Sequence, residues 1–286
     1  MKRVILCPNP YRDKGLAAAK AAESILRSVG LTTVYCLPFR PEGGDGQFGV
    51  PLRPLQQELR SSDLVVAFGG DGTILHLARA ASMRGVPVLG VNLGSLGFMS
   101  DLEAGELELL KNLAVGQFRR EKRMMLDVSV LREGRTVYTG SALNDAVVTK
   151  GAMARVVRLQ VSAGEDRLGL FSGDGVVVAT PTGSTGYSLS AGGPIVEPTA
   201  ENIIVTPICP HALSARSIVL GGDRQVAVRM GRMTRKTAYL SVDGGKAFRL
   251  SGGDTVELRR SAAKTRLVRL TGRSFYEILN HKLGGV

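Results

Sequence analysis

Tryptophan is missing from this 286-residue chain, and aromatic residues make up only 5% of it. Few rings are therefore available to stack against nucleic-acid bases. Long apolar runs are missing too: stretches such as 176–179 are far too short to cross a bilayer, and MKRVILCPNP has no signal-peptide core. The three cysteines stand far apart, at positions 7, 36 and 209, without metal-ligand spacing. With no export signal, we expect reduced thiols, a cytoplasmic location and no membrane partner.

Basic residues are present in excess. Lysine and arginine number 37 against 25 aspartates and glutamates, which gives a net charge of +12. Such a charge favours anionic partners, either nucleic acid or phosphate-rich metabolites. The basic residues are spread along the chain, with only short clusters such as 119–120 and 259–260, so we expect no nucleic-acid partner.

The first part of the chain alternates two patterns. Apolar, strand-like runs at 3–8, 31–37, 63–68 and 87–92 are separated by helix-like segments at 14–29, 73–84 and 103–115. This alternation predicts a Rossmann-like α/β domain over residues 1–119. Its ligands should lie at the carboxyl ends of the parallel strands.

The pattern changes after residue 119. Helical stretches nearly vanish, and short β-type runs follow at 125–130, 136–138, 146–149, 156–161, 226–230, 238–242 and 255–260. We therefore expect a β-rich, sandwich-like second domain over 120–270. The tail, 271–286, belongs with the first domain in this interpretation, and its helix at 274–282 packs back on that domain.

Two segments have a composition that suggests chemistry. Gly69-Gly-Asp-Gly-Thr73 joins an apolar strand to a helix, where glycines allow a close approach of backbone to ligand and the helix N-terminus attracts anions. A carboxylate at that place, Asp71, would repel a phosphate and needs a chemical reason. The second segment, 173–194, follows a buried strand with hydroxyls and glycines. It suits either a polyhydroxylated or phosphorylated ligand, or a plain Ser/Thr/Gly turn.

Together with Leu143-Asn-Asp145, these segments resemble the ATP-dependent NAD kinase family of the bacterial type. The order and separation of Gly69–Thr73, 143–145 and Thr180–Pro194 fit that family, and the resemblance covers nearly the whole chain. The GGDGT element alone is less specific, because diacylglycerol and sphingosine kinases carry it and phosphofructokinases carry a related form. The long TPTGST segment is what distinguishes NAD kinases.

The resemblance implies that the chain is a kinase, a transferase that moves the γ-phosphoryl group of ATP to the 2′-hydroxyl of the adenosine ribose of NAD and gives NADP. Asp71 matches the catalytic aspartate, a general base toward that hydroxyl; a helix N-cap aspartate is the alternative. Gly70, Gly72 and Thr73 are expected to bind substrate or cofactor, with the glycine amides holding the phosphates. Mg²⁺ enters bound to ATP, and no metal is expected on the protein itself.

Further positions match the family's contacts to NAD and ATP. They are His76, Phe98, Asn144, Asp145, Arg155, Asp174, Thr182, Thr185, Gly186, Tyr187, Ser188, Leu189 and Ser190. Structural alternatives stay open for several: a plain turn for 144–145, an exposed helix residue for His76, a solvated strand edge for Arg155, and core packing for Phe98 and Tyr187.

Two positions depart from the family. Gly186 stands where the family usually has alanine, and Ser172 stands where it often has arginine or lysine, which leaves the nicotinamide side of the site in doubt. The family also implies a homo-oligomer, dimer or tetramer, for which 207–217 with His211 is a candidate contact. The alternatives to an NAD kinase are a lipid or sugar kinase with the same GGDGT element and a dinucleotide sensor without turnover.

Overall fold

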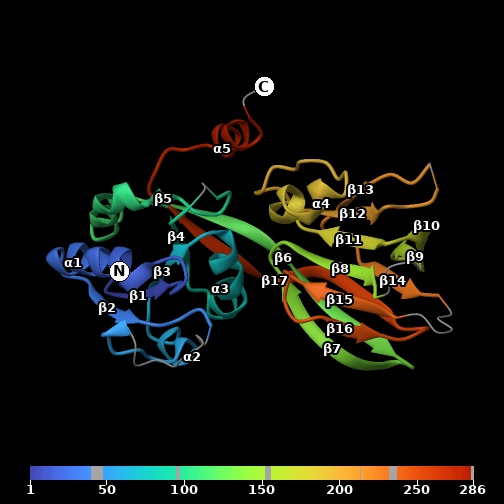
Figure 1. Ribbon diagram of the computed structural model, residues 1–286, viewed down its shortest axis with the longest axis horizontal. Coiled ribbons are helices and arrows are strands. Elements are labelled where there is room, and N and C mark those ends of the chain that lie inside the picture. The colour runs from blue at the N-terminus through green and yellow to red at the C-terminus, as the bar shows by residue number, and fades with distance from the viewer. Residues whose placement is uncertain (40–47, 95–96, 152–155, 213, 232–236, 285–286) are drawn as a thin grey trace. The chain divides into compact units, whose positions relative to one another are not determined.

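The computed structural model describes residues 1–39, 48–94, 97–151, 156–212, 214–231 and 237–284 (Figure 1). Contacts divide the chain into unit 1, residues 1–122 and 263–286, and unit 2, residues 123–262. The expected boundaries were 119/120 and 270/271. The difference has a physical reason: the long strands β6 (Arg119–Arg132) and β17 (Thr255–Arg269) run through both boundaries, so no glycine- or proline-rich linker marks them.

Unit 1 is built on a parallel sheet. Its strands β1 (Arg3–Pro8), β2 (Thr32–Tyr35), β3 (Leu64–Gly69) and β4 (Val88–Asn92) lie in the order β2-β1-β3-β4. The short β5 (Leu102–Glu103) and the last part of β17 pair with β4, also in parallel. Every residue of β3 and β4 is buried. This explains their continuous apolar runs, because a parallel sheet is covered on both faces.

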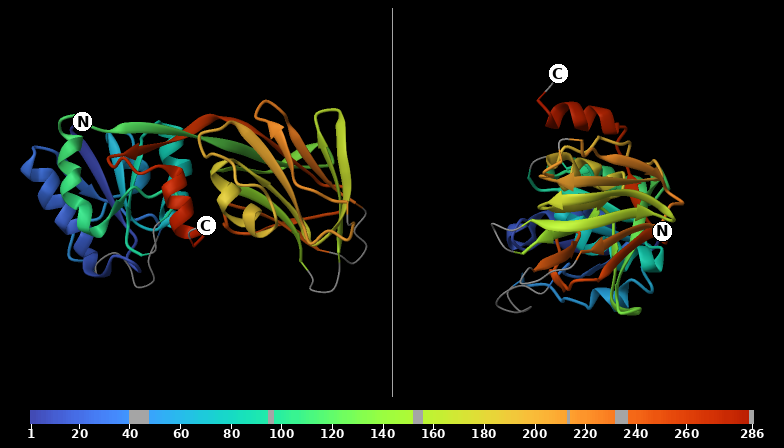
Figure 2. Two further views of the ribbon diagram at one scale, coloured as in Figure 1. Left: turned by 90° about the horizontal axis from the view of Figure 1, so that it is seen from above. Right: turned by 90° about the vertical axis from the view of Figure 1, so that its right-hand side faces the viewer.

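Helices cover both faces of this sheet. Helix α1 (Ala17–Ser28), after the 3₁₀ turn η1 (Lys14–Leu16), shares one apolar cluster with the 3₁₀ helix η3 (Ala104–Leu113). Figure 1 and the left panel of Figure 2 show these two helices side by side. Helix α3 (Asp71–Arg84) contacts β3 and β4, and its Ile74 lies over Gly90. Gly90 points away from the α1 cluster because it alternates along β4 with Leu89 and Val91, which belong to that cluster.

Two further helices complete unit 1. Helix α2 (Leu55–Glu58) is a single turn, and α5 (Phe275–Lys282) begins at the cap Ser274, which forms a capping box with Glu277. The Phe275 ring packs 5.9 Å from the ring of Phe98. The C-terminal helix therefore packs on the first domain, as predicted. No helix among the described residues has the length and apolar character needed to cross a membrane.

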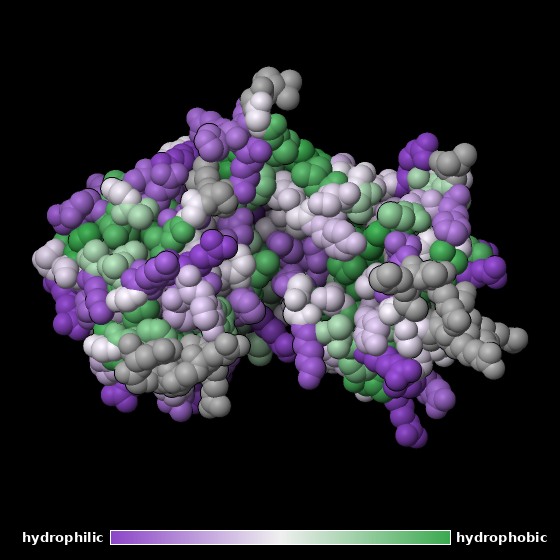
Figure 3. Space-filling view, in the orientation of Figure 1, coloured by the Kyte–Doolittle hydropathy of each residue, from purple (hydrophilic) through white to green (hydrophobic). Residues whose placement is uncertain are grey.

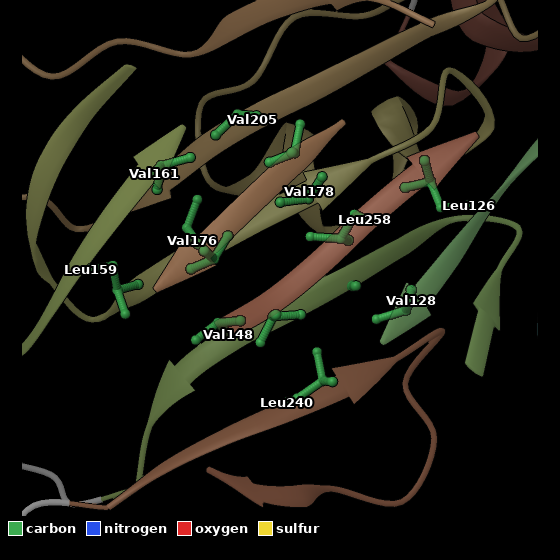
Figure 4. Close-up of a cluster of buried hydrophobic side chains, with 14 of the residues drawn as sticks. Leu126, Val128, Val148, Leu159, Val161, Val176, Val178, Val205, Leu240 and Leu258 are labelled. Carbon is green, nitrogen blue, oxygen red and sulfur yellow. The ribbon is translucent and has the colours of Figure 1, made fainter. Parts of the chain in front are cut away.

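Unit 2 is a β-sandwich. One sheet has the order β13-β12-β11-β8-β15-β16, and the other contains β10-β9-β14 and the first part of β17, with β6 and β7 alongside. The strand bounds are β7 (Arg135–Ala142), β8 (Asp145–Lys150), β9 (Val157–Ala163), β10 (Asp166–Gly173), β11 (Gly175–Ala179), β12 (Asn202–Ile208), β13 (Ile218–Gly221), β14 (Val226–Met230), β15 (Ala238–Val242) and β16 (Phe248–Leu250). Apolar side chains from both sheets meet in one core (Figure 4). On the face drawn in Figure 3, by contrast, hydrophobic residues occur in small groups among hydrophilic ones.

The second face of β11 is covered as well. Val176 and Val178 point into the sandwich core, whereas Val177 and Ala179 pack with Ile204 in a smaller cluster. Ala191 and Val196 lie against that smaller cluster, just after the short helical turns η4 (Thr182–Thr185) and α4 (Tyr187–Ser190). The glycine- and hydroxyl-rich segment is therefore held against the central strands of a sheet.

The predicted fold class, an α/β domain followed by a β-rich one, is correct, but several elements differ in detail. Strands β10, β12, β13 and β16 were not anticipated, and β6 and β17 are much longer than the expected 125–130 and 255–260. The segment 103–115 forms a 3₁₀ helix rather than an α-helix. Helix α3 begins at Asp71, two residues before the expected start.

Candidate functional site

The turn between β3 and α3 is tight and leaves backbone amides open. A Cβ on Gly69 would lie 3.1 Å from Thr73 Cβ and nearer still to its hydroxyl oxygen, so only glycine fits there. Gly70 is the N-cap of α3, and no side-chain bond caps that helix end. Helix N-terminal amides without a capping side chain can bind an anion. Asp71 is the first helical residue and not the cap, contrary to the structural alternative considered for it.

The side chain of Asp71 is held by a second turn, residues 97–100, which follows β4. Its Oδ2 accepts the N–H of Phe98 at 2.8 Å, and its Oδ1 accepts the N–H of Met99 at 3.1 Å. The N–H and the hydroxyl of Ser100 both lie 3.4 Å from Oδ1. Among the described residues, Oδ2 therefore accepts one donor and Oδ1 accepts three. Since a carboxylate oxygen has two lone pairs, Oδ2 is the atom with room for a ligand hydroxyl.

The turn 97–100 is fixed from its other side by Arg269, at the end of β17. This arginine is only 8% exposed. Its guanidinium donates to the carbonyls of Met99 (3.1 Å) and Ser100 (3.0 Å), so the turn directs its amides at Asp71 and its carbonyls at Arg269. A Cβ on Gly97 would lie 2.7 Å from Asp71 Cγ and nearer still to Oδ1. Sequence reasoning missed both Gly97 and Arg269. The two glycines three residues apart before Phe98, at 94 and 97, could have indicated Gly97.

The remaining predicted residues of unit 1 flank these two turns. The buried Thr73 accepts a bond from Asn9 Nδ2 at 3.3 Å, which ties α3 to the end of β1. Gly72 is exposed, as is His76, whose ring meets Phe39 edge-on at 5.5 Å. Phe98 is half-buried, and Lys282 Nζ lies 4.9 Å from the centre of its ring. Core packing therefore accounts for only part of the Phe98 surface.

In unit 2 the strand register brings three loops to one edge of a sheet. Ala179 at the end of β11 pairs with Asp145 at the start of β8, and Val242 at the end of β15 pairs with Ala146. The loops that precede β8 and follow β11 and β15 are therefore neighbours. They carry Asn144, the segment from Thr180 onward, and Asp243, respectively.

The segment after β11 folds directly onto the loop 143–145. Thr180 donates through its N–H to the Asn144 carbonyl (2.8 Å) and through its hydroxyl to the Leu143 carbonyl (2.5 Å). A Cβ on Gly183 would lie 2.8 Å from Asn144 Cα and nearer still to the Asn144 carbonyl. A Cβ on Gly186 would lie 3.7 Å from Asn144 Nδ2 and 3.9 Å from Asp145 Oδ2. The structure thus brings together residues 144, 145 and 186, which were predicted from distant parts of the sequence.

The hydroxyls of this segment fall into two groups. Buried Thr182 accepts a bond from the buried Arg123 at 3.2 Å, and Ser188 is bonded at 2.9 Å to Thr206, so both hydroxyls hold the segment in place. Thr185 is half-buried, its hydroxyl donating to the Thr182 carbonyl. Further along, the surface is open: Ser190 and Tyr187 are exposed, and Leu189 is half-buried. Tyr187 is 45% exposed and is not a core residue of the chain.

Two carboxylates lie together at this edge. Asp145 is only 6% exposed, and burial together with the charge of Asp243 raises its pKa to about 7. Burial also raises the pKa of Asp243, although three backbone N–H bonds counteract the rise. Beside them, Asn144 Oδ1 is buried and has no hydrogen-bond partner among the residues that the structure describes. A buried acceptor of this kind is costly unless a ligand or water donates to it.

Asp174 lies at the opposite end of β11. Lys150 Nζ contacts its Oδ1 at 2.6 Å, and the backbone N–H of Lys150 donates to its carbonyl at 2.8 Å. Ala179 lies five residue steps along the strand from Asp174, which is roughly 17 Å at the usual rise. Lys150 supplies a cation in the region where Ser172 stands in place of the family's basic residue, and sequence reasoning missed it. Arg155 lies outside the described residues.

Known proteins of one family resemble the chain along its whole length. The family model described as the ATP-NAD kinase N-terminal domain matches residues 53–115, and the one described as the ATP-NAD kinase C-terminal domain matches residues 143–270. An NAD kinase of Symbiobacterium thermophilum is 49% identical over 78% of this chain and 79% of its own length. An NAD kinase of Acetivibrio thermocellus is 36% identical over 99% of this chain and 97% of its own.

Solved structures agree with these sequence matches. The crystal structure of yeast NADH kinase complexed with NADH superposes with a TM-score of 0.86 at 27% identity, covering 99% of this chain and 88% of the yeast chain. An NAD kinase from Archaeoglobus fulgidus in complex with ATP has the same fold, with a TM-score of 0.76 at 24% identity over 99% of each chain. Two family models and relatives that match almost end to end lead to one conclusion: the chain belongs to the ATP-NAD kinase family.

Proposed function

We propose that the chain is an NAD kinase that transfers the γ-phosphoryl group of ATP to the 2′-hydroxyl of the adenosine ribose of NAD, with Asp71 as the general base. The geometry of the Asp71 carboxylate supports this role most directly. Four donors from the described part of the chain fix the side chain, and of these only the Phe98 N–H, at 2.8 Å, bonds to Oδ2. This oxygen can accept the hydroxyl proton as the new O–P bond forms, while Oδ1 keeps the side chain in place.

Unit 1 also offers contacts for the phosphate donor. The N-terminus of α3 has no capping side chain, and Gly70 and Gly72 allow a close approach of phosphate oxygens to the backbone. We expect ATP to bind there as its Mg²⁺ complex. In this proposal the metal enters as part of the substrate.

Unit 2 offers contacts for the dinucleotide. The unpartnered Asn144 Oδ1 and the Asp145 carboxylate suit a ribose diol, which presents hydroxyl donors. Thr185, the Gly186 backbone, Tyr187, Leu189 and Ser190 extend the surface outward. We assign the hydroxyls of Thr182 and Ser188 to positioning, because each is bonded inside the chain.

Three further features stay proposals: a homo-oligomer, a cytoplasmic location and Mg²⁺ dependence. The homo-oligomer rests on the family resemblance; Asp174 and Lys150 lie at the far end of β11 from Asn144. The segment near His211, whose N–H donates to the Ser172 carbonyl, lies close to that end. Sedimentation or light scattering with and without NAD tests this proposal.

The assay for the function uses purified protein, ATP, Mg²⁺ and a panel of acceptors: NAD, NADH, a diacylglycerol, sphingosine and a sugar. NADH is included because one similar structure is an NADH kinase. We expect NADP from NAD, read by an NADP-specific dehydrogenase. Phosphorylation of a lipid or sugar without NADP formation would favour the other kinases. Binding of NAD without any phosphorylated product would favour a sensor.

A further inference from the structure

Asp243 stands out among the residues at the edge of unit 2 because the proposed mechanism gives it nothing to do. It follows β15 in a turn, with a positive φ of 49° that is rare for a residue other than glycine. Its Oδ2 accepts the N–H of Leu143 at 2.8 Å, and its Oδ1 accepts those of Asn144 (2.8 Å) and Asp145 (3.1 Å). Its own N–H donates to the Asp145 carbonyl at 3.0 Å.

These four bonds join one residue to three successive residues of another loop. Amides of neighbouring residues converge on one point only in a bent backbone, and an anion at that point stabilises the bend. The bent loop 143–145 carries the unpartnered Asn144 Oδ1 and the Asp145 carboxylate. Without the anion, three donors would lose their acceptor and the loop would lose its fixed shape.

We propose that Asp243 is a positioning residue for the dinucleotide, whose carboxylate holds the loop 143–145 in the shape that presents Asn144 and Asp145 to the ribose of NAD. This inference rests on the proposed role of that loop in NAD binding. Asp243 does not touch the substrate itself. Its effect falls on NAD recognition and leaves the ATP side of the reaction, which belongs to unit 1, unchanged.

The charges of the two carboxylates are consistent with a positioning role for Asp243 and a ligand-binding role for Asp145. A protonated Asp243 would direct an O–H donor at amides that are themselves donors, so the positioning role needs its charged form. Asp145 is the group that can hold a proton near neutrality, since burial and the charge of Asp243 raise its pKa to about 7. The first carboxylate then keeps its three amides while the second interacts with the ligand.

The test replaces the positioning carboxylate and compares the two substrates. In Asp243→Asn an NH₂ group takes the place of one acceptor, so we expect the KM for NAD to rise about tenfold to hundredfold, as for the loss of one or two hydrogen bonds. The KM for ATP should stay within about twofold. Asp243→Glu keeps the charge but moves it by one methylene, so it should show a smaller rise.

Asp254→Asn is the matched control. Asp254 is 1% exposed, lies in another turn of unit 2, and accepts the Ser251 N–H and two bonds from Arg132, but none from the loop 143–145. We expect it to lower the Tm at least as much as Asp243→Asn while leaving the KM for NAD unchanged. Equal changes in the KM for NAD in both variants, or equal changes for NAD and ATP in Asp243→Asn, would overturn the proposal.

A measurement on the unaltered protein covers the case in which Asp243→Asn does not fold. Hydrogen exchange of the ligand-free chain should show the amides of 143–145 protected to the level of strand β8, and fast exchange of those amides would refute the positioning role. A different result would contradict the proposed function itself, namely that the unaltered chain makes no NADP. Calorimetry of NAD binding to the unaltered chain and to Asp243→Asn would still test the positioning role of Asp243.

Discussion

Two aspartates in this chain are held by the same device. Asp71 in unit 1 accepts three successive amides of the turn 98–100, and Asp243 in unit 2 accepts three successive amides of the loop 143–145. Each carboxylate is bonded to a bent loop, and a glycine-rich segment lies beside each loop: 69–73 beside the turn 98–100, and the segment after Thr180 beside the loop 143–145. Oδ2 of each carboxylate accepts a single backbone donor, so the difference lies in what else is near: Asp243 lies beside a buried carboxylate, Asp145, whose pKa its charge raises.

We infer that Asp71 is the reactive group of the two and Asp243 the scaffold. Both carboxylates carry more donors on Oδ1 than on Oδ2, so the donors alone do not distinguish them. Beside Asp243 lies a second carboxylate, Asp145, whose pKa the charge of Asp243 raises. A carboxylate on three amides is therefore no indication of catalysis by itself; the groups that face its remaining acceptor sites decide.

The largest effect is expected at the reactive aspartate. Asp71→Asn removes the negative charge and places a donor where Oδ2 would accept the ribose proton. We expect kcat to fall by about 10²–10⁴-fold, the usual contribution of a general base. Affinity for NAD, measured by calorimetry, should change little because the dinucleotide contacts are assigned to unit 2. A variant with near-normal kcat would remove Asp71 from the mechanism.

A smaller fall in kcat is expected when the Asp71 carboxylate is kept but displaced. In Gly97→Ala the new methyl would lie 2.7 Å from Asp71 Cγ and nearer still to Oδ1, so Asp71 must shift. A displacement of about 1 Å can cost on the order of 10²-fold in kcat. Gly94→Ala is the control in the same connection, because the nearest atom to its new Cβ, on Arg12, is 3.8 Å away. Equal kcat values for the two variants would show that Asp71 is not positioned from this side.

The carboxylate pair of unit 2 predicts a dependence of stability on pH. The pKa of Asp145 is about 7 in the fold and 3.8 as a free carboxyl, so between about pH 4 and pH 7 the folded chain holds a proton that the unfolded chain has released. The contribution of this group is present at low pH and is lost as the pH rises toward 7. Asp145→Asn cannot titrate. Its free energy of unfolding relative to the unaltered chain should therefore rise by about 2 kcal/mol from pH 5 to pH 8.

Urea unfolding of both proteins at the two pH values measures that difference. Groups that do not interact with Asp145 titrate equally in the two chains, so their contributions cancel. Parallel pH profiles would mean that Asp145 is ionised throughout, and the two carboxylates would then not share a desolvated environment.

Local patterns in the sequence predicted the parts of the site that depend on neighbours along the chain. The strand–GGDGT–helix turn, with Asp71 at its centre, follows from an apolar run, glycines and a helical period. Asp243 and Arg269 could not be found in this way. Their partners lie about a hundred residues away or more, and only the register of β15 with β8 and the course of β17 bring them together.

The same limit explains the errors in the fold. β10 was missed because exposed and half-buried residues break its apolar pattern, and a strand in a sheet tolerates them where one side faces water. The full length of β17 was missed because charged residues such as Arg259, Arg260 and Lys264 lie inside it. Conversely, β11 was found because both of its faces are covered, by the sandwich core and by the cluster under 191–196.

The smallest effects are expected from two glycines of the same segment, which compare a severe steric conflict with a mild one. In Gly183→Ala the new methyl would lie 2.8 Å from Asn144 Cα and nearer still to its carbonyl, so the loop 143–145 must move. The KM for NAD should rise about tenfold, as for one lost hydrogen bond. In Gly186→Ala the nearest atom to the new methyl, the Gly183 carbonyl oxygen, is 3.3 Å away, so a shift of a few tenths of an ångström accommodates the methyl. The KM for NAD should then change by less than about threefold. If the order of the two variants is reversed, ligand contact at position 186 matters more than the shape of the loop that Asp243 holds.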